Sequence, residues 1–440
     1  MVTLKTLGAC GEVGRSAFLV KHDSSQVLLD YGISMKGKQI LPGDIIPRDL
    51  NAIVVSHAHV DHTGALPYAY ISGKPPCFMM KPTRAIISIL LEDSLKISEH
   101  LLPFEMVEVK KLYKSTQLIN YNQRVNFKSF SFKLLDAGHI PGSALVLLNI
   151  GGKNIMYTGD LNTRDTRLLW GSKPKDIPPL DALIIESTYA STTHPPRIEV
   201  EKEFIGAVKS VLSGGGKVLI PAFGLARSQE VLSILQTYGL TKYNITIDGM
   251  ARSISRILVK YPDSLRAAYS IDNIHMIHRR RSREDRKKAL MQSDIIIAPS
   301  GMLKGGTVRY YAPHILQDEK NGLFLVSYQV EGTPGRILLE EGNYYADDAV
   351  DERSEAEDIA PRISIDVNAK VGKYDFSSHC DGNDLINFVK SLEFNEDNPN
   401  AQVFCVHGDR GNCEYLANLI NEEVRGVQGI APNREEQFSI

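Results

Sequence analysis

The chain has 440 residues, of which 43% are hydrophobic and 23% charged, and its formal net charge is −2 at pH 7. This composition excludes a disordered or fibrous chain and is typical of a globular protein with two domains of ordinary size. The near-neutral charge also excludes an overall basic surface. Any nucleic-acid partner must therefore be bound by a local positive patch.

Five cysteines are scattered along the chain with no C-x-x-C pair, which argues against a disulfide framework or a cysteine-ligated zinc. The N-terminal residues lead into a glycine-rich stretch, not a charged segment followed by a long apolar run, so we expect no signal peptide. No stretch reaches the roughly 18 apolar residues of a transmembrane helix. We therefore expect a soluble, cytoplasmic protein.

The first part of the chain predicts short strands with few helices between them. We expect strands at 18–20, 27–30, 52–56, 130–135, 144–150, 154–157 and 183–186, and helices at 84–96 and 103–112. This pattern favours a largely antiparallel sheet with helices packed outside it.

From about residue 195 strands and helices alternate regularly. We expect helices at 198–212, 226–237, 252–260 and 283–291, and strands at 217–221, 244–248, 294–299 and 323–328. Such alternation predicts a parallel sheet between helices.

Beyond this α/β region the acidic residues 347–358 read as a solvated connection. Strands are then expected at 362–367 and 403–406 with a helix at 382–392 between them, and the tail 432–440 as a surface extension. The predicted layout is one β-rich domain formed by 1–194 and 358–440, interrupted by an α/β domain at 195–357.

The run His57-Ala58-His59-Val60-Asp61-His62 places four ligand-type side chains in six positions after a buried strand. His57 and His59 are two residues apart on an extended segment, so they share a face and can reach one metal ion. The chain then turns toward a helix, which lets Asp61 and His62 reach a second ion. Imidazole and carboxylate ligands suit zinc, with manganese or iron as competitors.

Three further residues, Asp30, His139 and Asp160, each follow a predicted strand. Alone, such a histidine is more often a loop residue, and such an aspartate a turn former or helix cap. Together they share a position at strand ends, which converge on one edge in layered α/β proteins. This shared position predicts that they join the His57–His62 run in a single site.

The H-x-H-x-D-H run, with Asp30 before it and His139 and Asp160 after it, resembles the metallo-β-lactamase superfamily. The resemblance covers nearly the whole chain and implies an α/β fold, an αββα sandwich. It implies two zinc ions, with Mn²⁺ as a possible substitute. The implied ligands are His57, His59 and His139 for one ion, Asp61 and His62 for the other, and Asp160 as a bridge, with Asp30 orienting the cluster.

Three later residues resemble the markers of the β-CASP branch, which processes nucleic acids. They are Glu186 in Ile184–Tyr189, His379 in Phe376–Asp381, and His407 in Phe404–Asp409. The α/β insert lies where that branch carries its β-CASP domain. A histidine at the third marker accompanies RNA substrates in this branch, and the resemblance implies that His407 completes the coordination of the second ion.

The resemblance therefore implies a metal-dependent ribonuclease whose candidate catalytic residues are Asp61, Glu186 and His379. His379 would contact the scissile phosphate or protonate the leaving oxygen, supported by Glu186. The sequence resembles the short archaeal form of ribonuclease J, without KH modules. That form implies 5′-to-3′ exonucleolytic degradation favouring a 5′-monophosphate.

Several alternative functions remain open. They are an endoribonuclease of the mRNA 3′-end processing type, a small-molecule metallohydrolase, and a non-catalytic RNA-binding subunit. The complete ligand set disfavours the last of these. The family analogy also implies a homodimer, without support from particular residues.

Three segments of the insert are candidate contacts for single-stranded RNA. Arg227 resembles a residue of the family segment that lines the RNA path, and the turn at Ser300, Gly301 and Met302 has backbone N–H groups for a terminal phosphate. The most basic stretch contains Arg279, Arg280 and Arg281 and continues to Lys288. The alternative, purely structural roles of these segments are a helix start, a tight turn and a solvated helix face.

Overall fold

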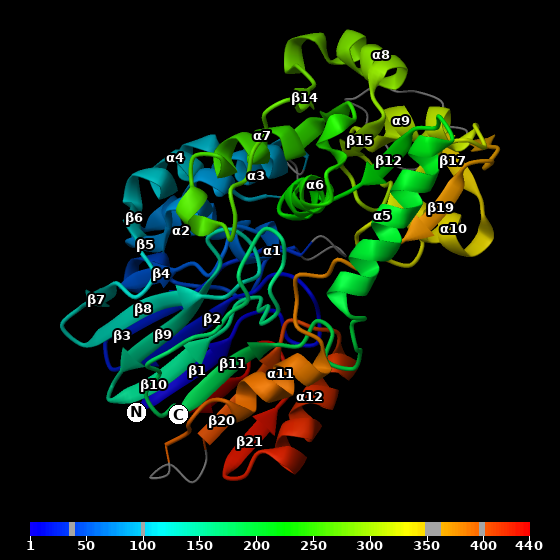
Figure 1. The fold of residues 1–440 in the computed structure, drawn as a ribbon. Coiled ribbons are helices and arrows are strands. Elements are labelled where there is room, and N and C mark those ends of the chain that lie inside the picture. Colours follow the sequence, from blue (N-terminus) through cyan, green and yellow to red (C-terminus); the bar gives the residue numbers. More distant parts are fainter. Residues whose placement is uncertain (35–39, 98–101, 348–361, 396–400) are drawn as a thin grey trace. The chain divides into compact units, whose positions relative to one another are not determined.

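The computed structural model describes residues 1–34, 40–97, 102–347, 362–395 and 401–440, and the chain in it forms two compact units (Figure 1). Unit 1 comprises 1–165, 169–193 and 378–440, and unit 2 comprises 166–168 and 194–377. The expected boundary between 357 and 358, and most of the acidic stretch 347–358, lie outside the described residues.

Unit 1 contains two seven-stranded sheets. The order of the first is β22-β1-β2-β3-β4-β5-β6, and that of the second is β21-β20-β11-β10-β9-β8-β7. The strands of the first sheet are β1 (Val2–Thr6), β2 (Phe18–His22), β3 (Ser25–Leu29), β4 (Ala52–Val54), β5 (Cys77–Met80), β6 (Thr116–Ile119) and β22 (Gln437–Ser439). Those of the second are β7 (Arg124–Asn126), β8 (Phe130–Asp136), β9 (Ala144–Ile150), β10 (Lys153–Tyr157), β11 (Ala182–Glu186), β20 (Ala401–Val406) and β21 (Val427–Ile430).

The expectation of a largely antiparallel sheet is wrong for both. In the first sheet β22, β1, β2 and β3 pair antiparallel, but β3, β4, β5 and β6 pair parallel. In the second, β7 to β10 pair antiparallel, whereas β10, β11, β20 and β21 pair parallel. Parallel neighbours need crossover connections, and short strands separated by loops do not reveal these in the sequence.

The tail 432–440 is not a plain surface extension either. Its residues Gln437–Ser439 pair with β1 as strand β22, and Phe438 packs against the core between the sheets. The chain therefore ends beside the strand with which it begins.

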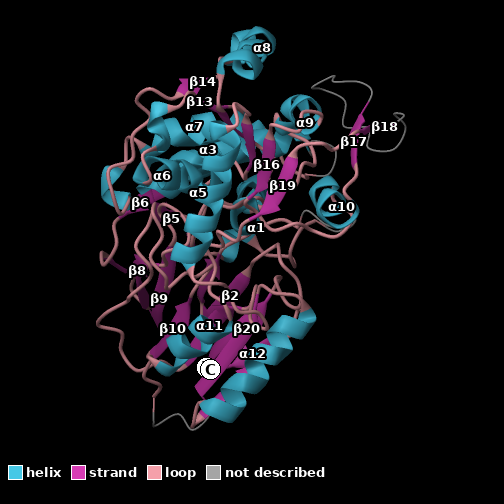
Figure 2. Ribbon diagram, turned by 45° about the vertical axis from the view of Figure 1, so that its right-hand side comes forward, coloured by secondary structure: helices cyan, strands magenta, loops and turns pink. Residues whose placement is uncertain are grey.

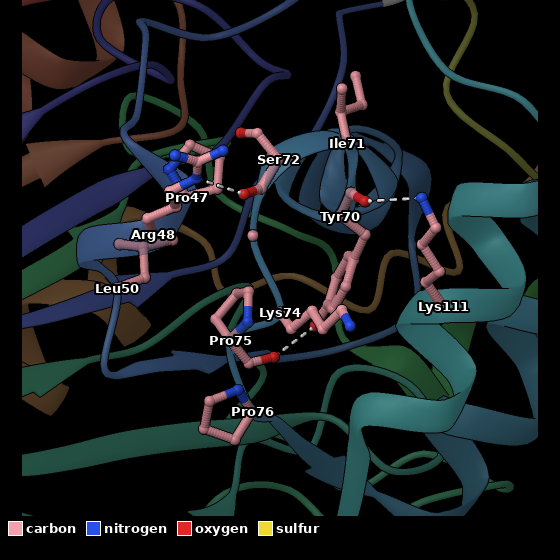
Figure 3. A pocket seen from close by; sticks show the side chains of 11 residues that line it. Pro47, Arg48, Leu50, Tyr70, Ile71, Ser72, Lys74, Pro75, Pro76 and Lys111 are labelled. Atoms are coloured by element: carbon pink, nitrogen blue, oxygen red, sulfur yellow. Dashed lines mark hydrogen bonds between the residues drawn. The ribbon is translucent and has the colours of Figure 1, made fainter.

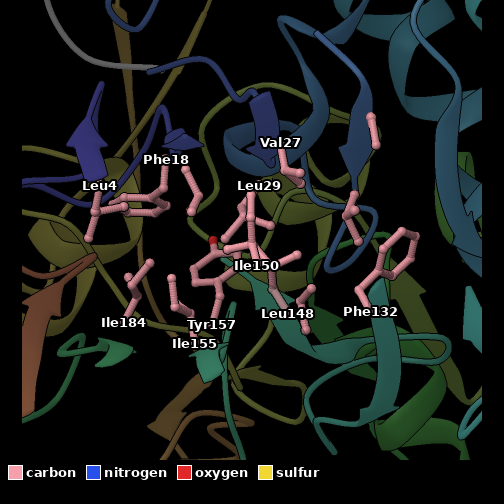
Figure 4. Close-up of a cluster of buried hydrophobic side chains, with 14 of the residues drawn as sticks. Leu4, Phe18, Val27, Leu29, Phe132, Leu148, Ile150, Ile155, Tyr157 and Ile184 are labelled. Atoms are coloured by element: carbon pink, nitrogen blue, oxygen red, sulfur yellow. The ribbon is translucent and has the colours of Figure 1, made fainter. Parts of the chain in front are cut away.

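The core of unit 1 lies between the two sheets and draws side chains from both (Figure 4). Because strand side chains alternate, Val27, Leu29 and Val54 face this core, whereas Leu28 and Ile53 point to the other face. Both of these are fully buried, so the outer face of the sheet is covered as well. Strands buried on both faces read as continuous apolar runs, which explains their sequences.

Helices cover the outer faces of the two sheets of unit 1. Helix α3 packs on β5 and β6, and α12 packs on β20 and β21. A second apolar core forms under α11 and α12. The helices of this unit are α1 (Val60–Thr63), α2 (Ala69–Ser72), α3 (Lys81–Ile97), α4 (Met106–Ser115), α11 (Gly382–Lys390) and α12 (Arg410–Glu423), with short η1 (Pro47–Asp49) and η2 (Leu66–Tyr68).

Unit 2 is built on a six-stranded sheet of order β14-β13-β15-β12-β16-β19, in which every pair is parallel, as the alternation predicts (Figure 2). Its strands are β12 (Val218–Pro221), β13 (Ile245–Ile247), β14 (His275–Met276), β15 (Ile295–Ala298), β16 (Gly322–Leu325) and β19 (Lys370–Lys373), with a separate antiparallel pair β17 (Tyr344–Asp347) and β18 (Arg362–Ile365). Its helices are α5 (Arg197–Ser213), α6 (Arg227–Thr237), α7 (Gly249–Leu258), α8 (Ser282–Gln292), α9 (Val308–Leu316) and α10 (Pro334–Glu341), with short η3 (Leu240–Lys242), η4 (Pro262–Ser264) and η5 (Arg279–Arg281).

Within the described ranges, no helix combines the length and the apolar character needed to cross a membrane.

Truncating Phe132 tests the packing between the two sheets. Phe132 is buried and its ring lies against that of Phe78, with 5.1 Å between centroids. We expect Phe132→Ala to lower the free energy of unfolding of unit 1 by about 3–5 kcal/mol, because it leaves a cavity in a dense core. Urea denaturation measures this, with Val107→Ala on the exposed side of α4 as control. A loss below about 1 kcal/mol would show that the core does not depend on this contact.

Candidate metal centre

Polar side chains gather where six strands of unit 1 end. In the first sheet, β3 leads to Asp30 and β4 leads to His57. In the second sheet four more strands end on such residues: β8 leads to His139, β10 to Asp160 and β20 to His407, and β11 ends on Glu186. Within each sheet these strands run in the same direction, so their carboxyl ends share one edge.

The first group of side chains is His57, His59, His139 and Asp160. The Nδ1 atom of His59 lies 3.1 Å from Nε2 of His57 and 3.2 Å from Nε2 of His139. The Oδ2 atom of Asp160 lies 3.4 Å from each of those two Nε2 atoms. A tetrahedral zinc with bonds of 2.0–2.1 Å would separate its ligand atoms by roughly 3.3–3.4 Å, so these four atoms fit one ion.

The second group is Asp61, His62 and His407. Asp61 Oδ2 lies 3.3 Å from Nε2 of His407. Helix α1 begins at Val60, immediately after His59, and it carries Asp61 and His62, whose ring lies 4.0 Å from that of His57. His62 is fully buried, whereas the side chain of Asp61 is 24% exposed.

Asp160 faces both groups with different oxygens. Its Oδ2 atom faces the histidines of the first group, whereas its Oδ1 atom lies 3.1 Å from Nε2 of His62 and 2.6 Å from Nδ1 of His407. Four buried histidines therefore surround one carboxylate. This is the geometry required of a residue that bridges two ions.

Asp30 is completely buried and contacts the residues that position the ligands. Its Oδ1 accepts the backbone N–H of Ser56 at 2.7 Å, and its Oδ2 accepts the hydroxyls of Ser56 and Tyr157 at 2.5 and 2.8 Å. Nδ1 of His62 also lies 2.8 Å from Oδ2. An Nδ1–H that donates to Asp30 leaves the Nε2 lone pair of His62 facing Asp160, which is the tautomer a metal ligand needs.

His139 and His57 are oriented in a similar way. Nδ1 of His139 lies 2.8 Å from the carbonyl oxygen of Ser378, and Nδ1 of His57 lies 3.0 Å from the hydroxyl of Ser56. Each contact fixes the ring so that Nε2 points into the first group.

The residues present fit divalent cations. Among the described residues, Asp160 Oδ1 and His407 Nδ1 are buried atoms without a hydrogen-bond partner, since their 2.6 Å approach lacks hydrogen-bond geometry. Buried polar atoms of this kind are expected where an ion belongs. Burial and the neighbouring His57 lower the pKa of His59 to about 3, and burial lowers the pKa of His57 and His139, which keeps these imidazoles neutral and able to bind metal.

In the second group the pKa values of the histidines are raised, not lowered. Burial alone would lower the pKa of His62, but the Asp160 carboxylate outweighs it and raises that pKa to about 10. The pKa of His407 is raised for the same reason. Protons on these rings compensate the buried carboxylates, and a bound cation would replace them.

Glu186 and His379 form a pair beside the first group. Nδ1 of His379 lies 3.0 Å from both carboxylate oxygens of Glu186, and the ring of His379 lies 4.4 Å from that of His139. Glu186 is fully buried and also accepts the backbone N–H of Leu161 at 2.6 Å. Burial would lower the pKa of His379, but Glu186 raises it above its usual value.

The three predicted RNA-contact segments all lie in unit 2. Arg227 is the first residue of α6, and Arg279–Arg281 form η5, in which the Arg280 and Arg281 side chains are exposed. A Cβ on Gly301 would lie 2.5 Å from the Ser327 hydroxyl, so that side chain packs closely against this glycine. Gly301 is buried, whereas Ser300 and Met302 on either side are partly exposed.

Unit 1 also has a surface hollow of about 510 Å³ that is separate from the ligand cluster (Figure 3). Leu50 and Pro76 in its wall precede β4 and β5, whereas His57 follows the other end of β4. The hollow therefore lies at the opposite edge of the sheet and contains none of the candidate ligands.

Comparison with known proteins agrees with this geometry. The Beta-Casp domain family matches residues 228–338, and the family described as Zn-dependent metallo-hydrolase RNA specificity domain matches 364–432. A third family, Anti-Pycsar protein Apyc1, matches residues 11–177.

Similar whole proteins extend the match over the chain. RNase aCSPSF2 of Saccharolobus solfataricus is 38% identical over 99% of this chain and 85% of its own length. Probable RNase MJ4 of Methanocaldococcus jannaschii is 36% identical, covering 98% and 99%. The chain belongs to the β-CASP ribonuclease family of the metallo-β-lactamase superfamily. The resemblance drawn from the sequence is confirmed.

A solved structure supports the fold of this β-CASP chain. A protein of unknown function from Enterococcus faecalis matches 99% of both chains with a TM-score of 0.61 at 14% identity. Together with the two sheets, their outer helices and the parallel-sheet insert, this confirms the predicted fold class. The His/Asp groups and the zinc-dependent family also establish a divalent-metal site in this β-CASP protein.

Sequence reasoning missed the partners that orient the ligands. Ser56 and Tyr157 each donate a hydroxyl to Asp30, and the Ser378 carbonyl accepts from His139. Ser56 and Tyr157 stand near motif residues, so their positions alone could have signalled them. The Ser378 carbonyl could not be found, because any residue offers a carbonyl.

Replacing Asp30 tests the role of the residues behind the ligands. In Asp30→Asn one acceptor oxygen becomes an NH₂ group, so at least one of the present donors loses its partner. We expect divalent-metal affinity to fall about 10–100-fold, as measured by competition with a chelator. Asp23→Asn, in the exposed β2–β3 turn, is the matched control. Equal affinities for wild type and Asp30→Asn would contradict this role.

Proposed function

We propose that this chain is a metal-dependent ribonuclease that degrades single-stranded RNA from the 5′ end and favours a 5′-monophosphate. The observation that carries the proposal is the placement of Asp160 between two ligand groups, with the Glu186–His379 pair beside them. Relatives named RNase and the match to an RNA specificity domain support RNA as the substrate.

Two zinc ions, or manganese ions in their place, would be held by the two groups. His57, His59 and His139 would hold one ion, and Asp61, His62 and His407 the other, with Asp160 shared between them. When bound, such ions stabilise negative charge on a phosphoryl group as Lewis acids. Asp61 would thus contribute to catalysis as a ligand of the second ion.

His379 is placed to move the proton that the reaction requires. Glu186 engages Nδ1 of His379 and orients the ring, and the His379 side chain is 19% exposed whereas Glu186 is fully buried. The pKa raised by Glu186 favours the protonated ring. A protonated His379 can donate to the 3′ oxygen that leaves when the phosphodiester is cleaved.

The basic residues of unit 2 would add attraction for the RNA backbone. Arg280, Arg281 and Arg283 are exposed, as are Lys287 and Lys288, whereas Arg286 is buried and pairs with Asp248 at 2.7 Å. Arg227, Ser300, Gly301 and Met302 remain proposed contacts for the RNA path. We also propose a cytoplasmic homodimer; the five free cysteines are consistent with a reducing compartment.

Three RNA substrates separate the proposed activity from its rivals. We expect the purified chain, supplied with zinc or manganese, to release mononucleotides from 5′-monophosphate RNA and to leave 5′-triphosphate and circular RNA largely intact. Cleavage of the circle would instead identify an endoribonuclease. If none of the three is cleaved with either metal, the nuclease proposal is wrong and a small-molecule substrate becomes the leading alternative.

Removing His379 tests proton transfer apart from metal binding. We expect His379→Ala to lower kcat by about 10²–10⁴-fold while the metal content stays at the wild-type level. His22→Ala, at the end of β2 that lies away from the ligand edge, is the control and should retain full activity. A variant that loses its metal together with its activity would reveal a ligand role for His379.

A further inference from the structure

Trp170 is the only tryptophan of the chain, and its side chain is exposed. It is 53% exposed in the segment between β10 and β11, although its neighbours Leu169, Gly171 and Ser172 are all buried. Indole is the largest side chain and gains most from burial, so a half-exposed tryptophan offers a broad aromatic surface to a ligand.

The segment that presents Trp170 is fixed to the loop that carries His139. The backbone N–H of Asn162 donates to Ala137 at 3.0 Å, and the Ser172 hydroxyl donates to the carbonyl of Asp136 at 2.6 Å. A Cβ on Gly138 would lie 3.0 Å from the carbonyl oxygen of Trp170. The backbone of Trp170 therefore lies against the residue that precedes His139.

The same segment is also tied to the Glu186–His379 pair. The N–H of Leu161 donates to Glu186, and the carbonyl of Leu161 accepts the N–H of Cys380 at 2.8 Å. Arg164 forms 2.6 Å ion pairs with Asp381 and Asp384, just after that cysteine. The segment between β10 and β11 thus contacts the His139 loop, Glu186 and the residues that follow His379.

We propose that Trp170 is a stacking platform for one nucleobase of the bound RNA, presented by the segment that lies against the His139 loop. This inference rests on the proposed ribonuclease function and adds a base-binding subsite to the metal centre. Every base has a π-face, so an indole platform binds bases of any sequence, as a general RNA-degrading enzyme requires. It also adds an aromatic surface to a site whose other groups are all suited to phosphate.

Because the chain has a single tryptophan, its fluorescence reports on this subsite alone. The probe is a 5′-phosphorylated oligoadenylate RNA added to His379→Ala, which keeps the metal ligands but cleaves slowly. We expect saturating RNA to quench the fluorescence, with a midpoint equal to the Kd from filter binding. Bound RNA that leaves the fluorescence unchanged would overturn the proposal.

Substitution gives the second readout in otherwise wild-type protein. We expect Trp170→Ala to raise KM about ten-fold with a small change in kcat, and Trp170→Phe to restore most of the loss. Tyr415→Ala, an equally exposed aromatic on α12, should leave KM unchanged. An abasic ribose at one RNA position should raise KM for wild type but add nothing in Trp170→Ala.

The two proposals fail in different ways. Wild-type protein that cleaves none of the RNAs defeats the ribonuclease function. Active protein in which Trp170→Ala keeps the wild-type KM, or in which no abasic position depends on Trp170, defeats only the stacking platform.

Discussion

The buried carboxylate of Asp160, with four histidines around it, is the interaction on which the rest of the site depends. Asp160 is 2% exposed. Burial alone would raise its pKa, but His407, His62 and His57 lower it well below its usual value. A buried carboxylate costs several kcal/mol unless positive charge surrounds it, so this centre is stable only with protons on its histidines or cations in their place. The buried negative charge therefore favours the binding of metal cations.

The fold meets this requirement by bringing strand ends from two sheets to one place. Two glycines allow the close approach. A Cβ on Gly32 would lie 1.7 Å from the Asp61 carbonyl, and one on Gly159 would lie 2.6 Å from the Ser56 side chain. The residues after β3 can therefore lie against the start of α1, and those after β10 against the turn that leads to His57. Asp30 and His407 hold left-handed backbone conformations, with φ of 55° and 50°. Such local strain is typical of functional sites that the surrounding packing over-determines.

Much of this centre could be predicted from the sequence, because metal-ligand residue types stand close together in the chain or directly after predicted strands. Four ligand-type residues within His57–His62 predicted their own grouping, and the strand-end positions of His139 and Asp160 predicted that they join it. The parallel pairing of β3 to β6 could not be predicted, because it depends on contacts distant in sequence. The tail strand β22 was missed because its three residues are too few to show the alternation of apolar and polar residues that predicts a strand.

The central claim is that Asp160 would be shared by two ions, one held by each ligand group. The most direct test is anomalous X-ray diffraction from crystals grown with zinc, measured on both sides of the zinc absorption edge. The account predicts two anomalous peaks, each about 2.0–2.2 Å from a different oxygen of Asp160, one beside His59 and one beside His407. A single peak, or two peaks with Asp160 bound to only one of them, would contradict it.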